Sequence, residues 1–378
     1  MLSLCGDQSH VAVALVEPVA GRFRLVGWQM AAWSYPHPPD RIHEPYRQVC
    51  RQLGEQLGRP LWDEEAQRPY MEDPEPALGL HVGQVAVAAQ PLPPLRVWMA
   101  ALSELESLAA LQEALSTALS QPVGHCTLEE ERRPDALARA LQETAPHVAI
   151  VAGGYDLPDA SAQEPILELC DLVAQALSEL PPTQRPWLFF AGNRWAAAEA
   201  LDLWMSLPGG VHAEAVENIL PRPGWRHPAP LTVALSRAYW RRCQDLPVLR
   251  TLADWATPPA QLRSFSWCFV QTVRLWREAQ GLEELYGLYR GDARWLHVWE
   301  AGDEDGVHLR FTEPGGKPPA DWPPLGLLSG RGLDPSLRAQ ARWIDPEGLA
   351  PAIGNLGQFD PEVARQVLTL DVLGSVDI

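Results

Sequence analysis

Alternating apolar and polar positions open the chain. Val11, Val13 and Leu15 occupy every second position, and a second alternating run follows a turn at residues 20–21. A period of two is typical of paired β-strands, so we expect a hairpin near the N-terminus. Beyond a proline-rich stretch the spacing changes, because apolar side chains between residues 42 and 53 recur at helical intervals.

Between residues 81 and 220, short apolar runs alternate with amphipathic segments. The segment 163–180 carries one apolar stripe at helical spacing, and similar segments join the other apolar runs. Continuous apolar runs are typical of parallel strands that are covered on both faces. This part of the chain is therefore predicted to form a three-layer, mostly parallel α/β sandwich. Its expected strands include HVGQVAVAA, LRVWMAAL, HVAIVAGG and WLFFAGN.

The pattern changes twice more toward the C-terminus. Residues 221–284 have mainly helical spacing, and strand patterns return from residue 285 in ELYGLYR, ARWLHVWEAG and GVHLRFTE. A turn at residues 302–306 predicts that the last two of these strands form a hairpin. Beyond it we expect a short strand at 325–330 and a helix at 361–370.

The charge balance narrows the range of partners. The 378 residues include 48 acidic and 30 basic side chains, which give a formal net charge of −18. Such a charge repels phosphate backbones and anionic lipid headgroups, so we expect no nucleic acid and no membrane as partner. We find neither an apolar run of membrane-spanning length nor a secretory signal pattern, and we therefore expect a cytoplasmic protein.

No sequence pattern assigns a catalytic residue or a metal site. The six cysteines occur singly, without a CxxC pair or a histidine at zinc-binding distance, so most are expected to be buried thiols. GxSxG, Walker and GxGxxG motifs are also missing. Five tryptophans at helical spacings are predicted to pack in a core, with a partner surface as the alternative: Trp225, Trp240, Trp255, Trp267 and Trp276.

Polar residues at the ends of the central strands form a candidate ligand site. In parallel sheets, ligands bind in the crevice beyond the carboxyl ends of the strands. The glycines of the GGYD turn would let a ligand approach the backbone, but they would equally permit a purely structural turn. The other polar residues are also compatible with helix capping and ordinary strand ends. The candidates are Gly153, Gly154, Asp156, Asn193, Glu217 and Asn218.

Several segments together resemble one protein family. PHVAIVAGGYD, FFAGN and AVENILPRPG resemble signatures of the glutamate mutase L family (MutL or GlmL), and PLRVWMAAL and the segment 343–368 resemble further family segments. This family belongs to the actin, sugar-kinase and Hsp70-like ATPase superfamily. The resemblance implies actin-like, ribonuclease-H-like domains around the α/β sandwich. The implied parts are 1–80 and 221–284 for the first domain, 81–220 for an inserted subdomain, and 285–378 for a shortened second domain.

The first phosphate-binding loop of the superfamily is altered here. Its D-x-G-S/T pattern supplies a carboxylate for a metal-bound water and small residues whose N–H groups face phosphate. In this chain Cys5 stands at the Asp position, Gly6 follows, and Asp7 stands at the Gly position. A thiol is a poor ligand for Mg²⁺, and a carboxylate in the turn would repel phosphate.

The second phosphate loop is altered as well. The family pattern D-x-G-x-x-T-T corresponds to YRGDARW, in which Tyr289 replaces the Asp and Gly291 is retained. Asp292, Arg294 and Trp295 replace small or hydroxyl residues. A tryptophan beside the loop would block close approach of the backbone to phosphate. ATP with Mg²⁺ is therefore a disfavoured cofactor, and no other cofactor is indicated.

Three functions follow from these observations. The resemblance together with two altered loops favours a catalytically degenerate paralogue that acts as a binding, scaffold or regulatory protein, with a related ATPase-like protein or a cobalamin-dependent mutase as partner. An active ATP-dependent chaperone that reactivates such a mutase is the first alternative. A small-molecule enzyme that uses the strand-end crevice is the second.

Overall fold

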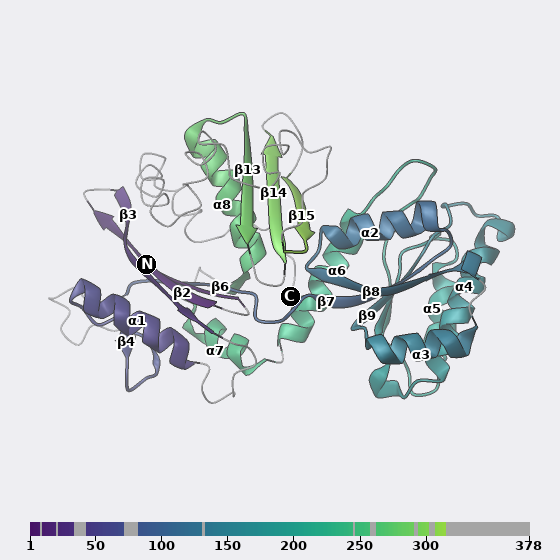
Figure 1. Cartoon of the computed structure of the whole chain (residues 1–378), viewed down its shortest axis with the longest axis horizontal. Helices are drawn as coiled ribbons and strands as arrows, with labels where there is room; N and C mark the ends of the chain where they lie inside the picture. Colours follow the sequence, from purple (N-terminus) through teal and green to yellow (C-terminus); the bar gives the residue numbers. More distant parts are fainter. Residues whose placement is uncertain are drawn as a thin grey trace. The chain divides into compact units, whose positions relative to one another are not determined.

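The computed structural model divides the chain into two compact units. The first contains Met1–Pro93 and Arg242–Ile378, and the second contains Pro94–Arg241 (Figure 1). The sequence boundaries at 81 and 221 differ from this division, because the strand at 85–89 pairs within the first unit and most of the helix at 229–244 belongs to the second. The structure describes residues 1–7, 10–19, 22–33, 43–71, 82–130, 133–244, 246–257, 262–290, 294–301 and 307–314.

The first unit contains a five-stranded sheet with the order β12-β6-β1-β2-β3. Strand β2 runs antiparallel to β1 and β3, whereas β1, β6 and β12 run parallel to one another. Among the described strands, this order, with β2 as the one reversed strand, is the ribonuclease-H-like arrangement that the family resemblance implies. The strands are β1 (Leu2–Gly6), β2 (His10–Val19), β3 (Arg22–Ala32), β6 (Val85–Ala89) and β12 (Leu262–Ser264).

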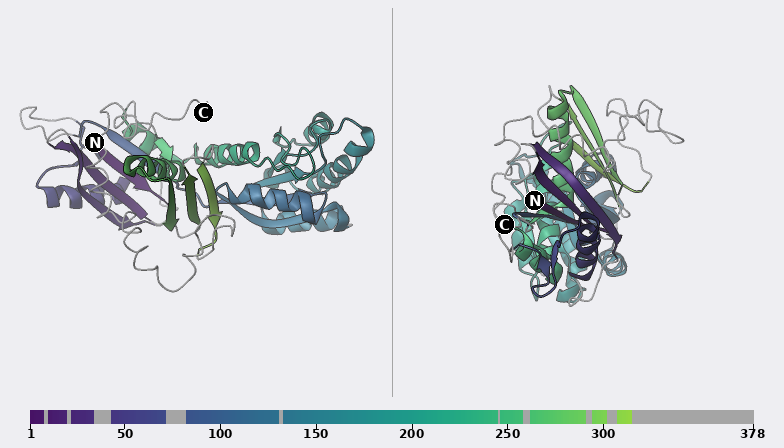
Figure 2. Two further views of the ribbon diagram at one scale, coloured as in Figure 1. Left: turned by 90° about the horizontal axis from the view of Figure 1, so that it is seen from above. Right: turned by 90° about the vertical axis from the view of Figure 1, so that its left-hand side faces the viewer.

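Helix α1 (His43–Leu57) lies along one face of this sheet (Figures 1 and 2). Alternate side chains of β1 and β2 are buried, and α1 adds Tyr46, Val49 and Leu53 to the same core. The ring of Tyr46 also contacts Trp255, at the end of α7 (Pro247–Trp255), edge to face. Trp255 thus packs in the core as predicted. A small hairpin, β4 (Trp62–Asp63) and β5 (Arg68–Pro69), completes this region.

An antiparallel three-stranded sheet follows helix α8 (Phe265–Gln280) in the first unit. Leu296, Val298 and Phe311 are buried, and they share the sheet face that contacts α8. The strands lie where the sequence predicts them: β13 (Glu284–Arg290), β14 (Trp295–Ala301) and β15 (Val307–Thr312). The expected turn at 302–306, strand at 325–330, helix at 361–370 and family segment at 343–368 lie outside the described residues.

The second unit contains a five-stranded sheet in which all strands are parallel, with the order β11-β10-β9-β7-β8. Strand β7 lies between β8 and β9, so the chain turns to opposite sides of β7 when it forms these two strands. This is a doubly wound order with its switch point between β7 and β9. The strands are β7 (Leu95–Ala101), β8 (Ser120–Thr127), β9 (Val148–Ala152), β10 (Trp187–Phe190) and β11 (Ala213–Ala215).

Helices cover both faces of the second sheet. Helices α3 (Pro134–Thr144), α4 (Ala160–Ser178) and α5 (Ala197–Met205) pack on the face that carries Trp98 and Phe190. Helices α2 (Ala109–Ser116) and α6 (Ala229–Gln244) lie beside each other, as the 2.5 Å hydrogen bond between Thr117 and Thr232 indicates. A π-helical turn at Glu104–Leu108 leads into α2. The predicted three-layer α/β sandwich is confirmed.

Candidate functional site

The first predicted phosphate loop is mostly strand. Cys5 and Gly6 belong to β1 and pair with Ala12 and Val11 of β2. Asp7 follows β1: its N–H donates to the carbonyl of His10 (3.0 Å), and its Oδ1 accepts from the N–H of His10 (2.8 Å). The carboxylate thus closes a tight hairpin connection, which is a common structural use of aspartate in turns.

Gly6 is needed for packing against α1. A Cβ atom at this position would lie 2.2 Å from Tyr46 Oη and 3.4 Å from the Trp33 ring. Both distances are shorter than or at the limit of a normal carbon contact. The space that a phosphate would need beside this glycine is therefore filled by the side chain of Tyr46.

Two ionisable groups beside the turn stay protonated. Burial, with Cys268 and Asp7 nearby, raises the pKa of Cys5 well above its usual value. Burial, with Cys5 and Asp7 nearby, also raises the pKa of Tyr46, whose hydroxyl has no hydrogen-bond partner among the described residues. Cys5 is thus a neutral thiol at neutral pH, which is unsuited to Mg²⁺.

Tyr289 joins the second predicted phosphate loop to the first. Its ring packs against Phe265 and Phe269 of α8, with centroid distances of 4.3 and 5.9 Å. Its hydroxyl donates a 2.5 Å hydrogen bond to Oδ2 of Asp7. With His10 on Oδ1, both carboxylate oxygens of Asp7 therefore accept hydrogen bonds from the protein.

The other predicted residues of the second loop do not join this contact. Tyr289 pairs across the sheet with Leu296, so Trp295 lies on the opposite face of β14. We therefore do not find Trp295 on the loop side of the sheet, where it was expected. The residue that contacts Asp7 is Tyr289. Gly291 and Asp292 lie outside the described residues.

The GGYD turn follows β9, one of the two strands at the switch point of the second unit. Gly153 and Gly154 have φ values of 133° and 75°, which residues other than glycine rarely adopt. A Cβ atom on Gly153 would lie 2.7 Å from Cγ of Leu102, the residue that follows β7. Leu102 thus packs directly against the turn between the ends of β7 and β9.

Asp156 ties the neighbouring loops together. Its Oδ1 accepts from the N–H of Arg194 (3.0 Å) and from Nδ2 of Asn218 (2.9 Å). Its own N–H donates to the carbonyl of Pro221 (2.9 Å). Nδ2 of Asn218 also donates to the carbonyl of Gly154, so the loops after β9, β10 and β11 are connected through these two side chains.

Asn193 has an internal role, and Glu217 lies apart. Asn193 is fully buried, donates to the carbonyl of Leu157 (3.0 Å) and accepts from the N–H of Trp195 (3.0 Å). Glu217 is exposed and lies 3.7 Å from His227. The structure brings together Gly153, Gly154, Asp156, Asn193 and Asn218. Their side chains bond mainly to the protein itself, and only Oδ2 of Asp156 accepts no hydrogen bond from the described residues.

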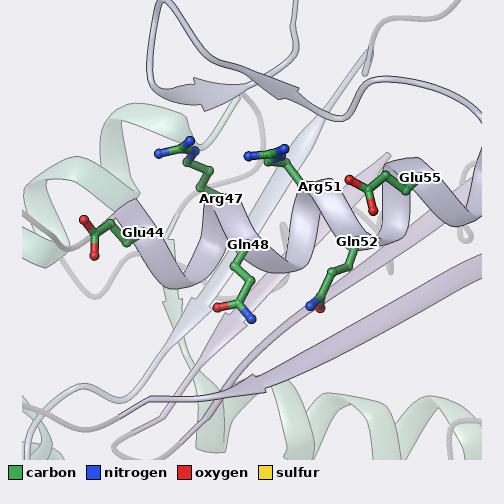
Figure 3. A pocket seen from close by; sticks show the side chains of 6 residues that line it. All are labelled: Glu44, Arg47, Gln48, Arg51, Gln52 and Glu55. Atoms are coloured by element: carbon green, nitrogen blue, oxygen red, sulfur yellow. The ribbon is translucent and has the colours of Figure 1, made fainter.

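A hollow on the outer face of α1 is lined by acidic, basic and amide side chains (Figure 3). Arg47 and Arg51 point to the same side, and both lie near Glu64, at 2.9 and 3.7 Å. This carboxylate offsets their charge. The lining comes from one helix only: Glu44, Arg47, Gln48, Arg51, Gln52 and Glu55.

A buried polar cluster in the antiparallel sheet was not indicated by any sequence motif. His297 is buried, with Nδ1 bonded to the hydroxyl of Tyr286 and Nε2 at 2.9 Å from Oγ1 of Thr312. Burial lowers the pKa of His297 to about 4 and raises the pKa of Tyr286. The three side chains come from three different strands, so only pairing register could have revealed them.

The described residues contain no group of three His, Cys, Asp or Glu side chains that could hold a metal ion. Within the same residues, every helix is too short or too polar to cross a membrane. All six cysteines are free thiols, and four of them are buried.

Comparisons with known proteins give only distant similarities. No family model and no curated protein matches the chain. A nucleotide-free structure of acetone carboxylase, from work on ATP-dependent acetone carboxylation, is 10% identical with a TM-score of 0.35, and the match covers 84% of this chain and 48% of that one. The chain thus spans about half the length of that protein.

A second solved structure is also similar at low score. It is RuvC from T. thermophilus in complex with a Holliday junction substrate, with 11% identity, a TM-score of 0.15, and coverage of 64% of this chain and 96% of that one. At these scores, neither structure informs the activity of this chain.

Proposed function

We propose that this chain is a catalytically degenerate relative of the glutamate mutase L-type ATPase-like proteins, and that it acts as a binding, scaffold or regulatory protein. The observation that carries the proposal is the 2.5 Å hydrogen bond from Tyr289 to Asp7. It joins the two positions that correspond to phosphate loops in the family. A bound phosphate would have to break this bond and approach a carboxylate.

The packing of Gly6 supports the same proposal. The small residue of the first loop faces Tyr46, so its open side is filled by protein. Cys5 beside it is a neutral thiol, which does not attract Mg²⁺. A working ATPase would need open space beside Gly6 and a metal-binding group at position 5. The proposal therefore disfavours ATP-dependent reactivation of a mutase by this chain.

The small-molecule enzyme is also disfavoured. Asp156, Asn193 and Asn218 use their polar atoms to hold loops of the second unit together. Of the Asp156 carboxylate, only Oδ2 accepts no hydrogen bond from the described residues, and the Arg194 guanidinium lies 4.0 Å from it. The proposed partner of this scaffold is a related ATPase-like protein or a cobalamin-dependent mutase.

Isothermal titration with ATP and Mg²⁺ tests the proposal. We expect no binding by the wild-type protein. The variant Tyr289→Phe should behave in the same way, because it frees Oδ2 of Asp7 but leaves the Gly6–Tyr46 packing and the carboxylate in place.

Tight binding of ATP to the wild-type protein that disappears when Mg²⁺ is chelated would contradict the proposal. ATP hydrolysis by the wild-type chain would do the same. Binding that appears only in Tyr289→Phe would also argue against degeneracy, since it would show a competent site that the tyrosine merely covers.

A further inference from the structure

Large apolar side chains are exposed at the carboxyl edge of the second-unit sheet. The exposed fractions are 47% for Leu157, 51% for Trp195 and 45% for Trp225. These residues follow strands β9, β10 and β11 respectively. Leu105, which follows β7, is 86% exposed. Trp225 is therefore exposed, whereas its helical spacing in the sequence predicted a position in the core.

The loops that carry these side chains are bonded to one another. Asn193 donates to the carbonyl of Leu157, and Asp156 donates through its N–H to the carbonyl of Pro221. The hydroxyl of Tyr155 donates to Glu106 (2.7 Å), which joins the loop after β9 to the turn after β7. The exposed apolar side chains thus stand on a connected set of loops.

Trp225 is held in place by a short turn and two neighbours. In the sequence RPGW, Gly224 has a φ of 72° and Trp225 donates to the carbonyl of Arg222 (3.1 Å), as in a β-turn. The Arg222 guanidinium lies 4.5 Å from the indole centroid. The ring of His227 stacks at 5.5 Å with an interplanar angle of 12°.

Trp195 has a similar arrangement. The Arg194 guanidinium lies 5.2 Å from its ring centroid, and the Arg194 side chain is 67% exposed. Arg194 has a distant carboxylate partner, Asp156, at 4.0 Å. Arg222 is exposed, and no carboxylate among the described residues forms an ion pair with it. The edge therefore presents two cations beside two tryptophans, with the exposed carboxylates of Glu104, Glu106, Asp159 and Glu217 elsewhere on the same loops.

We propose that this edge, which we call the tryptophan edge (Leu157, Arg194, Trp195, Arg222 and Trp225), binds an acidic amphipathic segment of a partner protein. Tryptophan and arginine are the residues that most often dominate the binding energy of protein interfaces. The two guanidinium groups fit carboxylates of the partner, and the indoles and Leu157 fit its apolar side chains.

Protein is favoured over nucleic acid because a phosphate backbone carries a charge at every nucleotide and is repelled by the net charge of −18, whereas a segment with two carboxylates can place both beside the two guanidinium groups. The inference rests on the proposed function, since a scaffold requires a surface for its partner. It adds the place of that surface and the chemistry of the partner segment. Nucleotide binding is measured separately, so a failure of one proposal can be told from a failure of the other.

Selection from a displayed library of random linear peptides, with the purified wild-type chain as bait, tests the inference. The probes are the selected peptides, resynthesised with a fluorescent label and measured by anisotropy. We expect them to combine Asp or Glu with large apolar residues. Affinity should fall about tenfold or more in Trp195→Ala/Trp225→Ala, as for interface hot spots. Arg222→Gln should weaken binding and reduce its dependence on salt.

Met205→Ala is the matched control. Met205 is 55% exposed and ends α5, the helix that leads away from the tryptophan edge. This variant should bind the peptides as the wild-type does, and circular dichroism of each variant should match the wild-type spectrum.

Failure to select any peptide would overturn the inference. So would selected peptides that are basic, or whose affinity is the same in the double tryptophan variant. A labelled single-stranded oligonucleotide that binds more tightly than the peptides, and loses binding in the double variant, would assign the edge to nucleic acid instead.

Discussion

The two units use a strand-end carboxylate in different ways. In the first unit, Asp7 is bonded to Tyr289, which lies 282 residues away in the sequence. In the second, Asp156 is bonded to Arg194 and Asn218, which are 38 and 62 residues away and belong to adjacent loops. Among the described residues, the first tie joins remote segments through one hydrogen bond, and the second is a local network. We therefore expect that disrupting the network around Asp156 lowers the free energy of unfolding more than disrupting the hydrogen bond between Tyr289 and Asp7.

The largest effect is expected for Asp156→Ala. The change leaves the N–H of Arg194 and an amide hydrogen of Asn218 without their acceptor in a partly buried position. We expect the free energy of unfolding to fall by roughly 3 kcal/mol, measured by urea denaturation. Glu217→Ala is the control: its exposed side chain lies outside the network, and a comparable loss there would break the comparison.

Gly6→Ala should have the next largest effect, because its Cβ would lie 2.2 Å from Tyr46 Oη. We expect a loss of about 2 to 3 kcal/mol from overpacking. In a Tyr46→Phe background the nearest atom is the ring carbon Cζ, at 3.3 Å, so the same change should cost much less. Equal losses in both backgrounds would show that the hydroxyl does not set the requirement for glycine.

Acid should weaken the sheet that carries Tyr289. The pKa of His297 is lowered to about 4 by burial, while an unfolded histidine titrates near 6.5. The unfolded state therefore binds more protons between these values, and stability falls as the pH decreases from about 6.5 to 4. At pH 5 the loss relative to pH 7 is about 2 kcal/mol.

Thermal unfolding at several pH values measures this loss, and His297→Gln should remove most of it. The hydrogen bonds of Asp156 involve no histidine, so amide exchange in β9 should depend less on pH than exchange in β14. A larger effect of acid on β9 would reverse the comparison.

Tyr289→Phe should have the smallest effect. It removes one hydrogen bond to a carboxylate but keeps the ring contacts with Phe265 and Phe269. We expect a loss of about 1 to 1.5 kcal/mol in denaturant titrations. Tyr155→Phe is a matched control, because the Tyr155 hydroxyl also donates to a carboxylate, in a solvent-exposed hydrogen bond; it should cost less than half as much. A loss for Tyr289→Phe as large as that for Asp156→Ala would mean that the first tie is part of a wider network.

Much of the fold could be predicted from periodicity. The alternation at Val11, Val13 and Leu15 predicts β2, and the apolar runs predict the buried parallel strands β7, β9 and β10. Local patterns do not show which sheet a strand joins. The run at 85–89 was expected in the middle domain, but it pairs with β1, because its side chains fit beside that strand in the first core.

The site could be predicted only in part, for the same reason. Glycines at positive φ and polar residues at strand ends leave a local signal, which is why Asp156 and Asn218 were identified together. Glu217 lies apart from the other candidate residues because of the path of the loop after β11, and a local sequence pattern does not show that path. The bond from Tyr289 to Asp7 requires knowledge of tertiary structure, and the exposure of Trp225 follows from a turn that a helical spacing count ignores.

The insertion of the second unit between β6 and β12 has a consequence for the order in which the protein forms during synthesis. Strands β1, β2, β3 and β6 leave the ribosome early, but β12 and α8 follow only after Arg241. The second unit is continuous in sequence and can complete its core while the first still lacks an edge strand and the Tyr289 segment. Slow synthesis of residues 94–241 should therefore prolong the time during which β6 is an unpaired edge, exposed to chaperones or to misassembly.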